Sequence, residues 1–332
     1  MIDYKGILIF GETSEDILSI SAKELLGCGR KLSDTLAEEV AIILFGKDLN
    51  KATQEAIAYG ADTVYKINDP GLDEKGADFY IPYIQKIAIQ VQPRIILIAQ
   101  TATGSDIATR LAFRLNTAVT TDCIDLVFDK DSGLLKQTRP VYGGNVLAVF
   151  TSALHPQMSA VRTKVFSPIP PDSGRQGKII EIESMTGEIK SKPVILESVK
   201  QKTDGVRLQD APVIVAGGRG ISSAEGFKQL EELATLLGGA VGATRPPCDN
   251  GWISNSAQIG LTGKIVAPAL YFAVALSGSS QHISGCSGSK NIIAINKDPE
   301  ANIFNFARFG VVGDWKKIIP AFKDEIKKLL AG

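Results

Sequence analysis

Short apolar runs alternate with segments of helical periodicity over roughly the first third of the chain. Runs of strand length lie at Gly6–Phe10, Glu39–Phe45 and Arg94–Ala99, and apolar positions repeat with helical spacing over Ser14–Leu36 and Ala77–Val91. The run at Arg94–Ala99 is continuously apolar after its first residue, which is typical of a strand covered on both faces. Strands that alternate with helices in this way predict a mostly parallel α/β sheet.

The pattern changes at Asp122, after which turn residues rather than helices separate the strand-like runs. These runs are Ile124–Phe128, Leu135–Val141, Val146–Thr151 and Ser159–Phe166. Their spacing predicts an antiparallel extension of the first sheet. Two later runs, Lys178–Glu183 and Val194–Ser198, are interpreted as edge strands of the same half. The polar stretch Gln201–Asp210 is therefore the expected boundary between two domains.

The second half returns to alternating strands and helices, which predicts a second doubly wound domain with a Rossmann-like fold. We expect an N-terminal α/β domain at residues 1–203 and this second domain at residues 204–332. The expected strands and helices of the second domain are Pro212–Ala216, Ser223–Leu237, Ala240–Thr244, Tyr271–Leu276, Ile292–Asn296, Gly310–Gly313 and Trp315–Leu330. The stretch Pro246–Trp252 is expected to be a loop, because it is rich in proline, asparagine and glycine.

Charge and composition exclude several classes of function. The chain has 36 basic and 36 acidic residues, so no net field favours nucleic acid or an anionic membrane surface. Its longest apolar run, Ile265–Leu276, contains a proline and is too short to span a bilayer, and the N-terminus lacks a cationic leader. The four cysteines are scattered and only two histidines are present, so no metal site is expected. We expect a cytoplasmic protein that neither binds nucleic acid nor inserts directly into a membrane.

Glycine-rich and polar turns follow the predicted strands of the second domain. Gly217–Gly220 lies between a strand and a helix, as a dinucleotide-binding turn does, although a turn that only packs a helix explains the glycines equally well. Arg219 favours the first interpretation, because a guanidinium in such a turn can pair with a pyrophosphate. Arg245, at the end of the next strand, is either a surface arginine or a cation beside an anionic ligand.

Three further turns are candidates for contact with the same ligand. Ile259–Gly263 places the Thr262 hydroxyl between two glycines, where the backbone can approach a flat ring closely. Ser277–His282 follows a strand and opens a helix, which suits a phosphate or a ring oxygen, although a lone histidine there is more often structural. Asn296 ends a strand and suits either a ribose hydroxyl or an Asx turn. Five such turns at successive strand ends predict a nucleotide cofactor.

The order of these motifs closely resembles the alpha subunit of electron-transfer flavoproteins. The resemblance covers the second domain through GGRG, AVGATR, QIGLTGK, IVAP, SGSSQH and AINKDPEA, and it extends more loosely into the first half through GSD at residues 104–106 and YGGN at residues 142–145. It implies an electron carrier rather than an enzyme, with FAD bound noncovalently in the second domain. It also implies a heterodimer in which the N-terminal domain packs against a beta subunit that carries AMP or a second FAD.

Two electron routes are compatible with the resemblance. In the first, electrons pass from an acyl-CoA dehydrogenase or a similar donor to a quinone reductase. In the alternative, the chain belongs to an electron-bifurcating complex in which a second FAD in the beta subunit oxidises NADH. Two rival classes of protein remain. An autonomous nucleotide-dependent oxidoreductase is disfavoured because the chain shows no acid–base pair or activated cysteine. An adaptor that has lost its cofactor is disfavoured because Arg219, Thr262 and His282 are present.

The resemblance also assigns roles to residues of this chain. Arg219 and the turn Ser277–Gln281 would hold the pyrophosphate, Asn296 and Asp314 the adenosine end, and Gln258 the ribityl region. Nearer the ring, Thr262 would lie at flavin N5, His282 near the C2 carbonyl, and Arg245 against the ring. The full set of expected cofactor-binding residues is Arg219, Thr244, Arg245, Gln258, Ile259, Gly260, Leu261, Thr262, Ser277, Gly278, Ser279, Ser280, Gln281, His282, Asn296, Asp314 and Trp315.

Three of these residues depart from what is usual in the family. Thr244 stands where many relatives have serine, Leu261 where a glutamine is common, and Trp315 where a smaller aliphatic residue is usual. A cation about 4 Å from a reduced, anionic ring stabilises it by about 4 kcal/mol at an effective dielectric constant of 20, so a protein sets a flavin potential through such neighbours. We therefore expect these departures to alter flavin packing or potential.

Overall fold

The computed structural model describes residues 4–14, 16–68, 76–144, 146–185 and 206–331. The chain forms two compact units, one made of Met1–Pro140 and Leu147–Val199 and the other of Val141–Val146 and Lys200–Gly332. The expected boundary between residues 203 and 204 and the expected strand Val194–Ser198 lie outside the described residues. Among the residues that are described, no helix combines the length and the apolarity that a bilayer-spanning segment needs.

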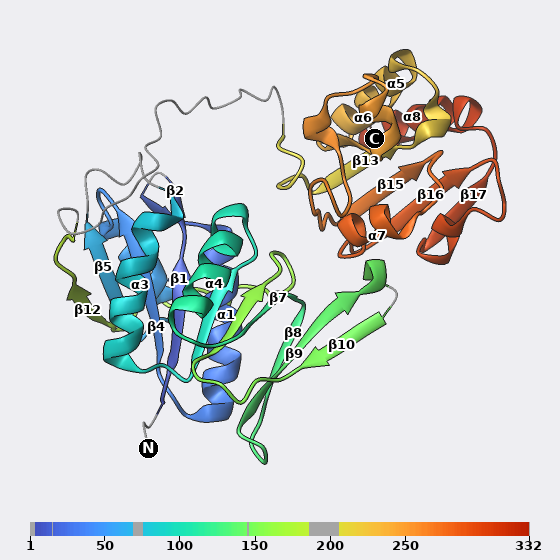
Figure 1. Cartoon of the computed structure of the whole chain (residues 1–332). Helices are drawn as coiled ribbons and strands as arrows, with labels where there is room; N and C mark the ends of the chain where they lie inside the picture. The colour runs from blue at the N-terminus through green and yellow to red at the C-terminus, as the bar shows by residue number, and fades with distance from the viewer. Residues whose placement is uncertain (1–3, 15, 69–75, 145, 186–205, 332) are drawn as a thin grey trace. The chain divides into compact units, whose positions relative to one another are not determined.

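The first unit is built on a seven-stranded sheet in the order β12-β5-β4-β1-β6-β11-β7, in which every described pair is parallel. Its strands are β1 (Ile7–Gly11), β4 (Val40–Gly46), β5 (Thr63–Asn68), β6 (Ile95–Ala99), β7 (Val119–Cys123), β11 (Gln157–Val161) and β12 (Lys178–Glu181). Helices α1 (Ile20–Leu36) and α2 (Asn50–Ala58) cover one face, while α3 (Ala77–Val91) and α4 (Ala102–Arg114) cover the other (Figure 1). The predicted parallel α/β sheet is confirmed.

The antiparallel strands form a separate three-stranded sheet rather than an extension of the first sheet, and this sheet is smaller than the sequence predicted. It consists of β8 (Asp125–Asp129), β9 (Leu134–Val141) and β10 (Val146–Phe150), of which β8 and β9 pair antiparallel. The run Ser159–Phe166 was assigned to this extension, and that assignment is wrong. Its first residues belong to β11, which lies between β6 and β7 in the parallel sheet, because all five β11 residues are buried and need cover on both faces.

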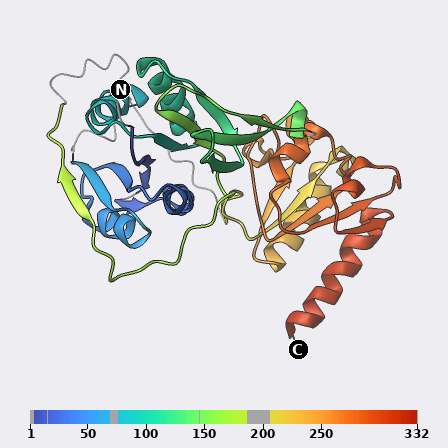
Figure 2. The ribbon, with the colours of Figure 1, turned by 90° about the horizontal axis from the view of Figure 1, so that it is seen from below.

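The second unit has five parallel strands in the order β14-β13-β15-β16-β17. These are β13 (Val213–Gly217), β14 (Ala240–Ala243), β15 (Leu270–Val274), β16 (Ile292–Asn296) and β17 (Phe309–Val312). Helices α5 (Ala224–Leu236), α6 (Arg245–Asp249) and α8 (Trp315–Ala331) lie on one face and α7 (Ser280–Cys286) on the other (Figure 1). Figure 2 shows α8 running out to the C-terminus. The predicted second doubly wound unit is confirmed.

Candidate cofactor site

The candidate site lies at the carboxyl edge of the second sheet. After β13 the chain moves to β14 on one side and then to β15 on the other, so the strand order reverses between β13 and β15. In open α/β sheets, ligands bind outside the carboxyl ends of the strands at such a reversal. Arg219, Arg245, Ser277–His282, Asn296 and Asp314 follow or end the five strands. Four of the five predicted turns therefore meet at one edge, and the fifth, Ile259–Gly263, reaches the end of β14 through the Ile259 amide, which donates to the Ala243 carbonyl at 2.9 Å.

The turn after β13 owes its glycines to the approach of another strand end. A Cβ atom on Gly218 would lie 2.5 Å from the Leu276 side chain, and one on Gly220 would lie 3.0 Å from the Ala275 carbonyl oxygen. The Gly218 amide donates to the Val274 carbonyl at 2.9 Å, which holds the two strand ends together. Arg219 is exposed on this turn, and its guanidinium has no ion-pair or hydrogen-bond partner among the described residues. It is free to meet an anion.

The segment after β14 corrects a prediction. Pro246–Trp252 was expected to be a loop, but α6 begins at Arg245 with Thr244 as its N-cap. The prolines lie in the first helical turn, where their missing N–H groups would have no helical partner anyway. Arg245 pairs with Asp249 at 3.2 Å, and both side chains are more than half exposed. Such a pair is worth about 0–1 kcal/mol, so Arg245 can exchange it for a ligand at little cost.

The turn between Gln258 and Gly263 is packed against the first turn of α7. The Leu261 amide donates to the Gln281 carbonyl at 2.7 Å, and the Gln258 side-chain amide donates to the Thr262 hydroxyl at 3.0 Å. Gly260 has φ +144°, and a Cβ atom there would lie 2.8 Å from the Gln281 carbonyl oxygen, so only glycine fits. Ile259 is buried, whereas Leu261 and Thr262 are exposed. The turn thus presents one hydroxyl and one apolar side chain outward.

The segment that follows β15 presents small polar groups. Gly278 has φ +78° and lies so close to Ile303 that a Cβ atom would come within 2.6 Å of its Cα. Ser277, Ser279 and Gln281 are exposed and Ser280 is half-buried. Ser279 caps α7 through its backbone, and its hydroxyl makes no capping hydrogen bond. These hydroxyl groups remain available to a ligand.

His282, which the resemblance placed near the flavin C2 carbonyl, is a buried residue of α7. Its side chain is only 4% exposed, and both ring nitrogens already have partners within the protein. Nε2 lies 2.9 Å from the Tyr271 hydroxyl and Nδ1 lies 3.0 Å from the Ile259 carbonyl oxygen. Burial lowers the pKa of His282 to about 4, so the ring is neutral. Tyr271, eleven positions earlier on a buried strand, gave no sequence signal of this pairing.

A cavity of about 260 Å³ lies beside the turns that follow β13, β16 and β17. Its lining includes Asn296, Asp314 and Trp315, which the sequence singled out, and Ser222 and Lys297, which it did not. Ser222 lies two positions after Gly220 and Lys297 directly follows Asn296, so closeness to a predicted motif was the sequence signal for both. Drug-sized ligands occupy pockets of about 300–1,000 Å³, so the cavity suits part of a dinucleotide while the rest lies along the exposed turns. In this respect the residues present fit the expected cofactor.

The cavity wall is held by hydrogen bonds between its own residues. Trp315 is 6% exposed, and its indole nitrogen donates to the Gly220 carbonyl at 3.1 Å, which joins α8 to the turn after β13. The Asn296 amide donates to the Leu276 carbonyl at 2.9 Å, and Asp314 accepts from the Lys316 amide at 3.0 Å. Both polar side chains keep a free acceptor position toward a ligand, because each oxygen has more than one lone pair.

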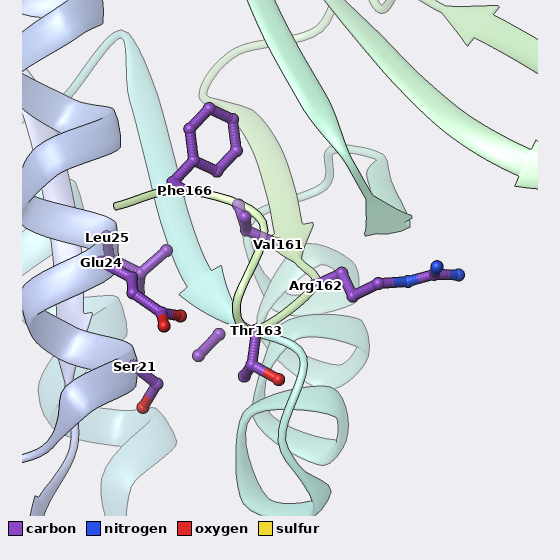
Figure 3. A pocket seen from close by; sticks show the side chains of 8 residues that line it. Ser21, Glu24, Leu25, Val161, Arg162, Thr163 and Phe166 are labelled. Carbon is purple, nitrogen blue, oxygen red and sulfur yellow. The ribbon is translucent and has the colours of Figure 1, made fainter. Parts of the chain in front are cut away.

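The first unit contains a small hollow between α1 and the end of β11 (Figure 3). Glu24 points into it from α1, and the Arg162 side chain points away from it (Figure 3). The Glu24 carboxylate accepts from the Lys164 amide at 2.7 Å, and Arg162 binds Asp122 through two contacts of 2.7 Å. Burial raises the pKa of Glu24. Glu24 thus ties the segment after β11 to α1, Arg162 ties it to β7, and both serve the structure of the first unit.

Comparisons with known proteins identify the family. Residues 7–185 match the model of the electron transfer flavoprotein domain, and residues 207–287 match the model of the electron transfer flavoprotein FAD-binding domain. The chain is 43% identical over 330 residues to electron transfer flavoprotein subunit alpha of Thermoanaerobacterium thermosaccharolyticum, covering 99% of this chain and 100% of that one. It is 41% identical to the same subunit of Megasphaera elsdenii (99% and 98% covered) and 38% identical to protein FixB of Clostridium saccharobutylicum (99% and 98% covered).

Proposed function

This chain belongs to the alpha-subunit family of electron transfer flavoproteins, and from that premise we propose that it binds FAD at the carboxyl edge of its second unit and transfers electrons within a heterodimer. One observation carries the proposal. The predicted turns gather along the carboxyl edge of the second sheet, beside a cavity that suits part of a dinucleotide.

The residues divide by the part of FAD that they would hold. The exposed Arg219 and the hydroxyl groups of Ser277–Ser280 suit the pyrophosphate, since charge-assisted and hydroxyl hydrogen bonds both favour phosphate oxygens. The cavity beside Asn296 and Trp315 suits the adenosine end. Thr262 lies on an exposed turn and Arg245 at the exposed start of α6, and both remain for the flavin ring. Bound FAD supplies the redox chemistry, while the chain binds it, orients it and sets its potential.

The proposed partner is a beta subunit that carries AMP or a second FAD. In the simple route, the heterodimer accepts electrons from an acyl-CoA dehydrogenase or a similar donor and delivers them to a quinone reductase. In the alternative, a second FAD in the beta subunit oxidises NADH in a bifurcating complex. Releasing and quantifying the nucleotides of the purified heterodimer separates the two: one FAD with AMP indicates the simple carrier, and two FAD with reduction by NADH indicates bifurcation.

Flavin occupancy tests the proposal itself. The heterodimer is purified with Arg219→Ala and, as a matched control, with Arg207→Ala, since Arg207 is an exposed arginine of the same unit that pairs with Asp210 instead. We expect Arg219→Ala to bind FAD about 10- to 100-fold more weakly, because one charge-assisted hydrogen bond contributes about 1.5–3 kcal/mol. The control should match the unaltered protein. A colourless heterodimer that cannot be reconstituted with FAD would refute the proposed function.

A further inference from the structure

The first sheet has a strand reversal of its own, between β1 and β6. Along the chain, β4 and β5 are added on one side of β1, and β6 then pairs with its other side. In open α/β sheets, ligands bind outside the carboxyl ends of the strands at such a reversal. Glu12 directly follows β1 and Thr101 lies two positions after β6, and the Thr101 hydroxyl donates to the Glu12 carboxylate at 2.6 Å. Glu12 therefore lies where a fold of this kind places a ligand.

A cavity of about 290 Å³ lies beside Glu12. Its apolar wall is formed by Phe10 near the end of β1, Phe45 near the end of β4, and Tyr80 of α3. The rings of Phe45 and Tyr80 meet edge to face with their centroids 4.9 Å apart. The other lining residues are small, namely Gly11, Thr13, Ser14, Ser19 and Thr103. Drug-sized ligands occupy pockets of about 300–1,000 Å³, so this cavity suits a small molecule.

Both oxygens of the Glu12 carboxylate accept hydrogen bonds from hydroxyl groups. The Thr101 hydroxyl donates to Oε1 at 2.6 Å, and the Ser21 hydroxyl donates to Oε2 at 3.2 Å. A hydroxyl has one hydrogen, so Ser21 donates to Glu12 and accepts from the Ser19 hydroxyl, 2.9 Å away. This arrangement suits the ionised carboxylate, and its oxygens keep lone pairs for a ligand.

The charge of Glu12 lacks a counter-charge in the part of the chain that the structure describes. No basic side chain of that part pairs with Glu12, and no lysine, arginine or histidine of that part lines the cavity. Burial raises the pKa of Glu12, and the hydrogen bonds from Thr101 and Ser21 oppose that shift. A partly buried carboxylate without a counter-charge favours a cationic ligand and repels a phosphate.

We propose that this cavity of the first unit binds a small organic cation, with an ammonium group on the Glu12 carboxylate and an apolar part against Phe45 and Tyr80. Aromatic rings attract a nearby cation and also cover the carbon skeleton of such a ligand. The site shares no residue with the FAD site proposed for the second unit. The two proposals therefore stand or fall separately.

Three probes of similar size and different charge test the proposal. Phenethylammonium, phenylethanol and phenylacetate each carry one ring and a short chain, which ends in a cationic, a neutral or an anionic group. Their affinities for the purified heterodimer are measured by saturation-transfer NMR. We expect phenethylammonium to bind about 10- to 100-fold more tightly than phenylethanol, because hydrogen bonds to charged groups are the stronger ones, and phenylacetate to bind most weakly. Equal affinities for the cation and the alcohol, or no saturation by about 10 mM of the cation, would overturn the proposal.

Two glutamine substitutions assign the preference to this cavity. Glu12→Gln removes the charge and keeps the size of the side chain, so the preference for phenethylammonium over phenylethanol should disappear. The variant should stay folded, since it removes a charge whose burial is unfavourable. Glu24→Gln is the matched control, because Glu24 is a buried carboxylate of the same unit outside this cavity, and the preference should persist there. A preference that survives Glu12→Gln would contradict the proposal.

Tyr80→Leu tests the aromatic wall without changing any charge. Tyr80 lies on α3 and is partly exposed, and the leucine keeps an apolar side chain against Phe45. We expect phenethylammonium to bind about 2- to 10-fold more weakly, because the cation loses an aromatic ring as its neighbour, while it still binds more tightly than phenylethanol. An unchanged affinity would place the probe away from this wall and would refute the proposed site.

Discussion

Gly285→Ala places a methyl group where the backbone of a neighbouring segment already lies. The added Cβ would come within 2.5 Å of the Gly260 Cα, and a backbone atom cannot move aside as the end of a flexible side chain can. Alanine favours a helix over glycine by about 1 kcal/mol, which works in favour of the variant because Gly285 lies in α7. The outcome depends on what the clash costs.

The cost has two parts. Overpacking in a well-packed core costs about 1–3 kcal/mol. Relief of the clash separates α7 from the turn and weakens two hydrogen bonds, from the Val266 amide to the Gly285 carbonyl at 2.8 Å and from the Leu261 amide to the Gln281 carbonyl at 2.7 Å. At about 1 kcal/mol each, these add about 2 kcal/mol. After the helix gain is subtracted, the variant should lose about 2–4 kcal/mol of unfolding free energy.

Urea unfolding followed by tryptophan fluorescence measures this loss in the relevant unit. Both tryptophans of the chain, Trp252 and Trp315, belong to the second unit, so their emission follows that unit by itself. Gly288→Ala is the matched control, since its Cβ would come no nearer than 3.2 Å to any atom, the Ala267 methyl group, and so makes a much milder contact. A loss for Gly285→Ala within 0.5 kcal/mol of the control would refute the reasoning (roughly the error of such measurements).

Two further variants test other parts of the structure. Trp315→Phe removes the indole donor to the Gly220 carbonyl and should lower the unfolding free energy of the second unit by about 1–2 kcal/mol in the same urea assay. Unchanged stability would contradict a role of Trp315 in joining α8 to the turn after β13. In the first unit, burial raises the pKa of Glu12, so the folded state binds its proton more tightly than the unfolded state and stability falls as pH rises above about 4.5. Glu12→Gln should reduce that fall in stability. Circular dichroism measures it in the unfolding transition of the first unit, which tryptophan fluorescence does not report. The control Glu39→Gln, at an exposed position, should leave the fall unchanged.

Local pattern predicted those elements whose burial follows one regular period. Ala77–Val91 is helical over the predicted range, because most of its apolar positions meet one face of the sheet, although Ile89 is 61% exposed. The same reasoning failed for Leu329, which continues the apolar spacing of α8 but is 81% exposed. Periodicity states which residues share a face and does not state where the neighbouring sheet ends.

Topology limited the prediction in the first unit. The run that includes β11 has strand character, and its sequence does not say which strands it joins. It pairs with β6 and β7, which lie far apart from it in the chain, so its place depends on the order of the whole sheet. The sequence likewise missed α6, because prolines are read as helix breakers although the first turn accepts them.

The candidate site was predictable in its segments and less so in its contacts. Glycine turns and polar residues after strands identified the edge, because strand ends and turn chemistry are local properties. The environment of His282 was not local. Its hydrogen-bond partners, Tyr271 and Ile259, approach it only in the folded chain, and burial in that chain lowers its pKa.

The outward position of Leu261 has a consequence for how this family can diversify. Gly260 and Gly285 are confined by backbone atoms, so substitution at either one moves the chain itself. Leu261 follows Gly260 in the chain, is 63% exposed, and has no positive φ angle that would restrict its identity. A change of side chain there alters polarity beside Thr262 without disturbing the turn. Position 261 can therefore accept different side chains, whereas positions 260 and 285 require glycine.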